Sequence, residues 1–316
     1  MSRTATLPLF PFPVTGRPEP DAEALRERSG VAHYPLPVRD ILNRQANGRM
    51  PFTWSINPYR GCEIGCTYCY ARYTHGFFDL DNWEDFERKI FVKREAGEAL
   101  ARRLRRSSLA GQPIAIGTAT DPYQPAERHH GITRSLLEAF LAAEGLEISL
   151  TTKSPLVLRD LDLLAELDRR HSITVNLTVT TLDPRLARRL ETHAPDPATR
   201  MRTVERLAEA GLAVQVFVKP LLPGINDDPA DLDALLAESG RAGACDVTAS
   251  PLFLRPAARA RFWPWLKAEF PALAGLYSRL YGRRDTLDAR ATDQLLADFR
   301  RLRLQHGFPR TRPGRA

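Results

Sequence analysis

Short apolar segments of strand length alternate with helix-like segments through the middle of this chain. β-branched residues mark strands at 113–119, 146–152, 172–181, 212–221 and 245–253, and helical periodicity predicts helices at 126–143, 155–170, 198–210 and 229–242. A strand near 52–59 and a helix around 94–106 complete six β-then-α units. Because such units build parallel sheets through right-handed crossovers, we expect an α/β fold whose sheet curls into a full or partial barrel.

The chain divides into three parts by pattern. Residues 1–50 contain Pro and Gly punctuation and little periodicity, which predicts an extended, partly irregular N-terminal arm. Residues 51–255 hold the alternating units and form the predicted barrel. Residues 256–316 are rich in aromatic residues and leucine and end in a basic tail, so we expect a C-terminal helical cap.

Composition excludes several classes of protein. With 43% hydrophobic and 26% charged residues, the chain is typical of globular proteins rather than disordered or collagen-like ones. No apolar stretch approaches the roughly 20 residues that cross a bilayer, and the opening residues lack a signal-peptide pattern, so we expect a cytoplasmic protein without a membrane partner. The net charge of +7 leaves nucleic acid open as a partner. Because only five of the 45 basic residues are lysine, this charge also fits a bias toward arginine in composition.

Three of the four cysteines lie within eight residues. Cys62, Cys66 and Cys69 follow the first predicted strand in a glycine-containing loop, with the spacing Cys-x3-Cys-x2-Cys. Three thiolates this close can each bind one iron of a cubane cluster. The fourth cysteine, Cys245, lies in the last predicted strand, where a small buried residue is the simpler interpretation. Such a cluster would keep one iron without a protein ligand.

Two other interpretations of the cysteines stay open. Structural zinc takes four ligands, and His75 could supply the fourth, which would make the chain a zinc-stabilised nucleic-acid-binding protein. Simple electron transfer, as in ferredoxins, is the second, although ferredoxins supply four cysteines to each cluster. Metal analysis separates these interpretations.

Polar residues follow the other predicted strands at the end where βα loops meet in such folds. Thr118, Thr120 and Asp121 follow the second strand, and Lys153 and Ser154 follow the third. Lys219 and the sequence LLPGIND end the fifth strand, and Ser250 the sixth. Polar residues are common at strand ends, which explains most of these positions. This explanation is weaker for Lys153 and Lys219, because the chain has only five lysines.

The cysteine spacing, with Tyr68 just before the last cysteine, resembles the signature of radical S-adenosylmethionine enzymes. Further strings resemble the spore photoproduct lyase-like branch, whose substrates are largely uncharacterised. They are GC-x3-C-x-YCYAR, GTATDPYQPAE, TTKS, TTLDPRLARRLE and PLLPGIND. The resemblance covers roughly residues 50–255 and implies a partial (β/α)6 barrel.

The resemblance implies a set of roles. Cys62, Cys66 and Cys69 would hold a [4Fe-4S] cluster whose open iron binds S-adenosylmethionine. Reductive cleavage would then give a 5′-deoxyadenosyl radical that abstracts hydrogen from a substrate, with a one-electron donor such as flavodoxin or ferredoxin as partner. Lys153 would pair with the methionyl carboxylate and Tyr68 would lie along the adenine. The hydroxyls of Thr118, Thr120 and Ser154 would contact the ribose and methionyl groups, although core packing or backbone capping also explains such residues.

The chain departs from the lyase pattern at one position. That enzyme uses a cysteine near the second strand as a hydrogen-atom donor, and the segment 117–127 contains none. Repair of thymine dimers by the same route is therefore not expected, and a lyase-type or a transferase-type reaction both stay open. The hydrogen abstracted and the oligomeric state are not specified by any motif.

Overall fold

Six parallel strands lie side by side in chain order in this computed structural model, which describes residues 22–45 and 50–310. Each strand is hydrogen-bonded to the next, and β3 is antiparallel to β4 at one edge. Within the described ranges no pairing joins the two edges, so the sheet is open, as in a partial barrel. The strands are β3 (Asn43–Arg44), β4 (Trp54–Ile56), β7 (Ile114–Ile116), β8 (Glu147–Thr152), β9 (Ser172–Thr178), β10 (Ala213–Leu221) and β11 (Asp246–Pro251).

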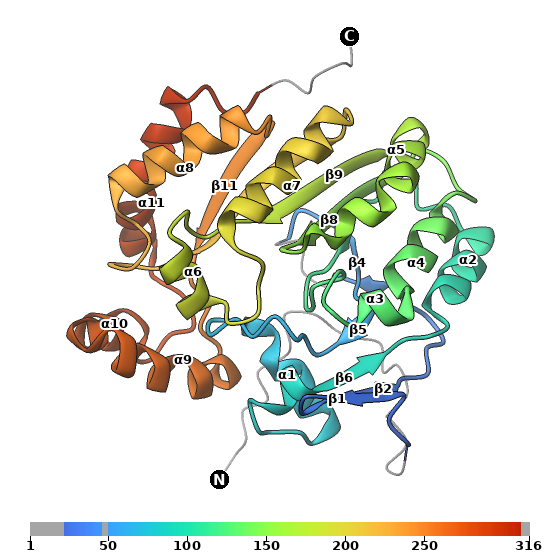
Figure 1. The fold of residues 1–316 in the computed structure, drawn as a ribbon, viewed down its shortest axis with the longest axis horizontal. Helices are drawn as coiled ribbons and strands as arrows, with labels where there is room; N and C mark the ends of the chain where they lie inside the picture. The colour runs from blue at the N-terminus through green and yellow to red at the C-terminus, as the bar shows by residue number, and fades with distance from the viewer. Residues whose placement is uncertain (1–21, 46–49, 311–316) are drawn as a thin grey trace.

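Helices cover one face of this sheet, and the crossovers that carry them lie along its outside (Figure 1). They bury the main apolar core against the strands. The predicted helix at 126–143 is broken in two because Gly131 adopts a φ of +62°, which ends one helix and begins the next. The helices are α2 (Ala96–Arg106), α3 (Glu127–His130), α4 (Ile132–Phe140), η2 (Pro155–Asp160), α5 (Leu161–Arg170), α7 (Pro197–Glu209) and α8 (Pro229–Arg241). The short helix α6 (Pro184–Leu190) instead belongs to a smaller apolar cluster that includes Cys62 and Cys66.

A second, smaller sheet lies beside the first and includes part of the N-terminal region (Figure 1). Its strand order is β1-β2-β6-β5, with β2 parallel to β6 and the other pairs antiparallel. The expected irregular arm therefore contributes strands where it is described. The strands are β1 (Arg26–Arg28), β2 (Val31–Pro35), β5 (Tyr59–Arg60) and β6 (Lys89–Val92), with η1 (Tyr70–Phe78) and α1 (Asp85–Arg88) between the last two.

The helices of the C-terminal region pack against two different parts of the fold. Helix α9 (Pro256–Glu269) packs against η1, beside the cysteine-containing loop, and η3 (Pro271–Leu273) and α10 (Ala274–Tyr281) follow it. Helix α11 (Ala289–Gln305) instead packs on α8 and β11, as the sixth outer helix of the barrel. No helix in the described part of the chain combines the length and apolarity needed to cross a membrane.

Candidate functional site

The three clustered cysteines lie in the loop that joins β5 to η1. Cys62 and Cys66 are each 8% exposed, and Cys69 is partly buried. The segment after β7 holds the loop from one side. There the Thr120 hydroxyl donates to the Gly61 carbonyl at 2.6 Å, and the Gln124 side chain bonds the Glu63 backbone N–H at 2.9 Å. The loop is thus built into the carboxyl edge of the sheet.

A second segment, which follows α6, holds the same loop from the opposite side. The Thr67 N–H donates to the Leu190 carbonyl at 2.9 Å, and the His193 N–H donates to the Ile64 carbonyl at 3.0 Å. These bonds place Cys66 opposite Glu191 in an isolated antiparallel bridge. The loop is therefore fixed before any metal binds.

Arg72 closes the loop from its carboxyl end. Its guanidinium donates to the Cys66 carbonyl at 2.7 Å and to the Trp83 carbonyl at 2.9 Å, and it forms an ion pair with Glu87. Its side chain is buried and lies over the ring of Phe86. A buried cation so placed keeps the backbone carbonyl at Cys66 satisfied.

Burial dominates the acidity of the thiols. Burial raises the pKa of Cys62 well above its usual value, and Asp121 and the other two thiols raise it further. Burial also raises the pKa of Cys66, to about 12, and that of Cys69, although Lys153 opposes both shifts. The thiols are therefore protonated at neutral pH, and only a bound metal would hold them as thiolates.

Lys153 lies above this loop, one residue beyond β8. Its N–H donates to Asp121 Oδ2 at 2.8 Å, and its ammonium is 5.9 Å from the centre of the Tyr68 ring. Burial lowers the pKa of Lys153, but Cys66, Glu191 and Asp121 more than offset this, so the pKa is raised. The ammonium has no ion pair with any residue that the structure describes. It is a fixed positive charge beside the thiols.

Asp121 joins the loops that follow β7 and β8. It accepts from the Thr152 hydroxyl at 2.6 Å and from the Tyr123 N–H at 2.9 Å, in addition to the Lys153 N–H. The approach of the two loops requires glycine at 117, where φ is +87° and a Cβ would lie 2.6 Å from the Thr151 carbonyl oxygen. The predicted turn role of Asp121 is thus only part of what it does.

Tyr68 extends from the cysteine loop into a buried ion pair. Its hydroxyl donates to Glu191, and Glu191 pairs with Arg200 at 2.6 Å, both side chains being at most 1% exposed. Arg200 also donates to the carbonyls of Thr178 and Pro195. Glu191 and Arg200 were not predicted as site residues, although Glu191 ends the string TTLDPRLARRLE.

The hydroxyls predicted to contact a cofactor lie in the same region with partners of their own. Thr118 Oγ1 accepts from the Asn57 amide at 3.0 Å, and its carbonyl accepts from the Tyr70 hydroxyl. Ser154 Oγ caps η2 by accepting from the Leu156 N–H at 3.2 Å. Thr120, as described above, holds the cysteine loop. Their contact with a cofactor stays a prediction.

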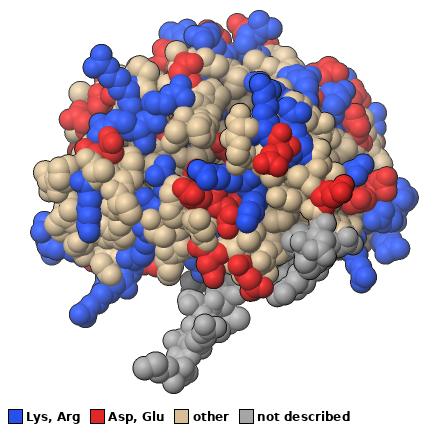
Figure 2. Space-filling view, turned by 60° about the horizontal axis from the view of Figure 1, so that its bottom comes forward, with Lys and Arg blue, Asp and Glu red and all other residues tan. Residues whose placement is uncertain are grey.

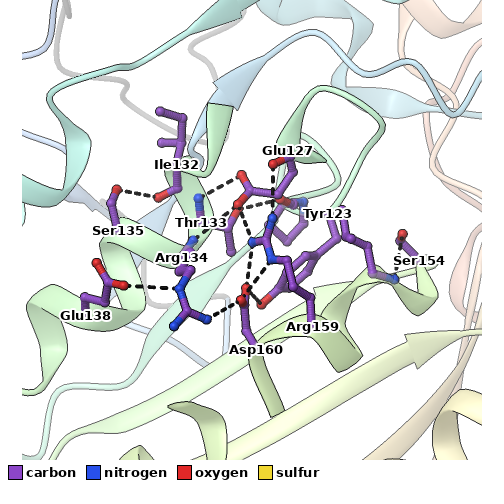
Figure 3. A network of polar contacts seen from close by, with 12 residues as sticks. Tyr123, Glu127, Ile132, Thr133, Arg134, Ser135, Glu138, Ser154, Arg159 and Asp160 are labelled. Atoms are coloured by element: carbon purple, nitrogen blue, oxygen red, sulfur yellow. Dashed lines mark hydrogen bonds and ion pairs between the residues drawn. The ribbon is translucent and has the colours of Figure 1, made fainter. Parts of the chain in front are cut away.

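A second buried network, also not predicted from the sequence, joins the segments that follow β7 and β8 (Figure 3). Glu127 accepts from the Arg159 guanidinium at 2.8 Å, from the Thr133 N–H at 2.8 Å and from the Tyr59 hydroxyl at 2.5 Å. Asp160 pairs with the same Arg159 at 2.7 Å. Both carboxylates are fully buried, so the segments after β7 and β8 are joined by satisfied charges.

His75, proposed as the fourth ligand of a zinc site, makes its contacts outside the cysteine loop. His75 Nε2 hydrogen-bonds the Lys89 carbonyl at 2.9 Å, and its ring packs against Phe86 and Phe91. Across residues 22–45 and 50–310, no three His, Cys, Asp or Glu side chains converge closely enough to hold one metal ion. A cubane binds each thiolate at a different iron, so its ligands need not converge on one point. Three thiols of one buried loop fit such a cluster.

The face of the molecule shown in Figure 2 carries charges of both signs. Figure 2 shows one face of the molecule, on which lysine and arginine side chains are interspersed with aspartate and glutamate. A nucleic-acid-binding surface is typically a patch or stripe of one sign. That partner is therefore not indicated by this face.

Comparisons with known proteins agree with the fold and the motif. The family model of the radical SAM superfamily matches residues 56–236. An uncharacterised protein of Mycobacterium tuberculosis is 36% identical over 255 residues, 80% of this chain and 75% of that protein. An uncharacterised protein of Methanocaldococcus jannaschii is 31% identical over 172 residues, 54% of this chain and 61% of that protein.

Solved structures add a likeness of fold. Spore photoproduct lyase complexed with dinucleoside spore photoproduct matches with a TM-score of 0.62 and 15% identity, over 84% of this chain and 77% of that chain. A variant of that lyase with bound AdoMet and the dinucleoside matches with a TM-score of 0.58 and 14% identity, over the same shares of the two chains. Taken with the cysteine loop, the family-model match establishes that this chain is an enzyme of the radical SAM superfamily.

Proposed function

We propose that this enzyme cleaves S-adenosylmethionine reductively and uses the product to abstract hydrogen from a substrate. The observation that carries the proposal is the loop of three thiols, two buried and one partly buried, with the unpaired ammonium of Lys153 beside it. A [4Fe-4S] cluster bound there would supply one electron to S-adenosylmethionine at its open iron and so generate a 5′-deoxyadenosyl radical. The chain's own residues would hold, orient and shield these groups.

Three residues have distinct proposed tasks. Lys153 would bind the methionyl carboxylate, because a point charge on a flexible side chain suits an anion that must be placed beside the thiols. Tyr68 would form a wall of the site, since Glu191 holds its hydroxyl and so orients its ring toward Lys153. Thr118, which is partly exposed beside the loop, is the hydroxyl best placed to meet a polar group of the cofactor.

Water exclusion follows from the packing around the loop. The aromatic residues Phe262 and Trp265 of α9 belong to the same apolar cluster as Cys62 and Cys66. A dry site strengthens electrostatic contacts and keeps a reactive radical from side reactions. Helices α9 and α10 would therefore act as a cover for the cysteine loop.

Anaerobic reconstitution tests this function. The protein should take up about four irons and four sulfides, and dithionite with S-adenosylmethionine should yield 5′-deoxyadenosine. Replacing Cys62, Cys66 or Cys69 by alanine should remove the cluster and the product together. Cys245→Ala is the matched control, because Cys245 lies at the start of β11 and donates to the Val214 carbonyl. Product formation by the three loop variants would defeat the proposal, as would colourless protein that holds a single zinc ion.

The electron donor and the substrate call for separate assays. We propose a one-electron donor of the flavodoxin or ferredoxin type, which should replace dithionite in the same reaction. Nucleic acid as substrate predicts binding that weakens steeply with salt, since phosphate contacts release counterions. Binding that is absent or insensitive to salt would redirect the search to small molecules or proteins.

A further inference from the structure

The inner face of the sheet, opposite the outer helices, carries a second lysine. Along β10 the side chains of Val214, Val216 and Val218 are at most 1% exposed and belong to the core with the helices. The residues that alternate with them, Gln215, Phe217 and Lys219, are partly exposed on the other face. The alternation of side chains along a strand thus places Lys219 on the inner face.

The same face carries Lys153. Thr151 pairs in register with Asn176, and Asn176 pairs with Gln215, so these three residues point to one side of the sheet. The Asn176 amide donates to Thr151 Oγ1 at 3.2 Å, which confirms the shared side. Lys153 follows Thr151 by two residues and Lys219 follows Gln215 by four. The sheet therefore presents two ammonium groups at its carboxyl end, on strands separated by β9.

Lys219 has no counter-ion. Its ammonium lies 3.4 Å from the centre of the Phe217 ring and has no hydrogen bond or ion pair with any residue in the described ranges. The charge of the Asp246 carboxylate acts to raise the pKa of Lys219, but Asp246 itself forms an ion pair with Arg303 at 2.7 Å. Burial consequently lowers the pKa of Lys219 to about 8.

An unpaired, partly buried ammonium is costly, and an apolar residue of similar length would cost less at this position. The strand end that carries it is also fixed. Asn226 accepts from the Leu222 N–H at 2.6 Å and donates to the carbonyls of Thr180 and Pro220. A rigid strand end with an unpaired cation over an aromatic ring is what recognition of an anion requires.

We propose that Lys219 binds an anionic group of the substrate, a carboxylate or a phosphate, on the inner face of the sheet. This inference rests on the proposed function and narrows its substrate class. The anion is distinct from the methionyl carboxylate, because Lys153 lies beside Tyr68 of the cysteine loop whereas Lys219 lies over Phe217 of β10. The charge on Lys219 would then place the substrate across the strands from the cysteine loop.

The five lysines make a direct test practical. Holoenzyme with the oxidised cluster and ¹³C-labelled lysine is saturated with S-adenosylmethionine, so that Lys153 is already occupied, and the ε-methylene signals are followed by NMR. Inorganic phosphate and acetate are added separately at constant ionic strength, with chloride as the reference anion. Lys219→Met assigns the Lys219 signal, and Lys267, exposed on α9, is the control.

We expect the Lys219 signal to shift saturably with phosphate, with acetate or with both, while the Lys267 signal follows ionic strength alone. A response to phosphate only identifies a phosphorylated substrate class, and a response to acetate only identifies a carboxylate. Equal behaviour of the two lysines with both anions would overturn the proposal. Formation of 5′-deoxyadenosine by the same preparation of unaltered enzyme tests the proposed function separately, so the two failures are distinguishable.

Discussion

Replacing Arg200 by methionine should destabilise the protein more than replacing any exposed arginine. The guanidinium pairs with Glu191 at 2.6 Å and donates to the Pro195 and Thr178 carbonyls at 2.8 and 2.9 Å. Leaving a buried carboxylate unpaired costs about 3–5 kcal/mol, and each carbonyl that loses its donor adds about 1 kcal/mol. We therefore expect the free energy of unfolding to fall by about 5–7 kcal/mol.

Urea unfolding of the apoprotein, followed by circular dichroism, measures this loss. The double variant Glu191→Gln with Arg200→Met should recover part of it, because the amide leaves no unpaired charge behind. Arg241→Met is the matched control, since Arg241 pairs with Glu238 at 2.6 Å on the surface, where ion pairs contribute little. If Arg200→Met lowers the free energy of unfolding no more than Arg241→Met does, the view that the Glu191–Arg200 ion pair is shielded from water and fixes Tyr68 is refuted.

Three further substitutions test other parts of the site. Gly117→Ala should destabilise the protein strongly, because its Cβ would meet the Thr151 carbonyl oxygen at 2.6 Å; Gly111→Ala, where nothing lies within 4 Å, should cost only the strain of positive φ in the same urea assay. Asp121→Asn should raise the Kd for S-adenosylmethionine about tenfold in equilibrium dialysis by loosening the Lys153 backbone, and an unchanged Kd would count against that role. Burial lowers the pKa of His75 to about 4, so the unfolded chain binds protons that the folded chain does not, and stability should fall as the pH decreases from about 6.5 to about 4. His75→Phe should remove part of that loss, and an identical pH profile for the variant would contradict it.

The alternation of strands and helices was sufficient to predict the main sheet. The segments expected at 113–119 and 172–181 contain β7 and β9, because their β-branched runs are continuous and buried. The fold class, a partial (β/α)6 barrel, is confirmed by the likeness to spore photoproduct lyase. Strand-length apolar runs are reliable signals of this kind since both faces of a parallel sheet are covered.

Other elements could not be predicted because their signals are short or non-local. The second sheet uses strands of two to five residues, and no period is measurable over such lengths. Helix α6 has only seven residues. Helix α11 has a clear helical periodicity and could be predicted as a helix. Because α9 and α10 lie between β11 and α11 in the chain, the sequence does not show that α11 packs on the barrel rather than in the C-terminal cap.

The candidate site, like the fold, could be predicted from the sequence only in part. The three cysteines and Lys153 could be predicted as site residues because their types and spacing are rare in this chain. Glu191 and Arg200 were missed because their pairing brings together α6 and α7, and a lone Glu or Arg in a helical segment is usually solvated. Hydrogen bonds such as Thr120 to Gly61 join distant segments, and no sequence pattern records them.

The vacant iron is the central claim, and electron paramagnetic resonance of the reduced, reconstituted enzyme tests it most directly. Spectra are recorded with and without S-adenosylmethionine, using 5′-methylthioadenosine as a control that lacks the amino and carboxylate groups. We predict that the g-values of the reduced cluster change on addition of S-adenosylmethionine, because its amino and carboxylate groups bind the iron that no cysteine holds. Identical spectra with saturating S-adenosylmethionine would contradict the account.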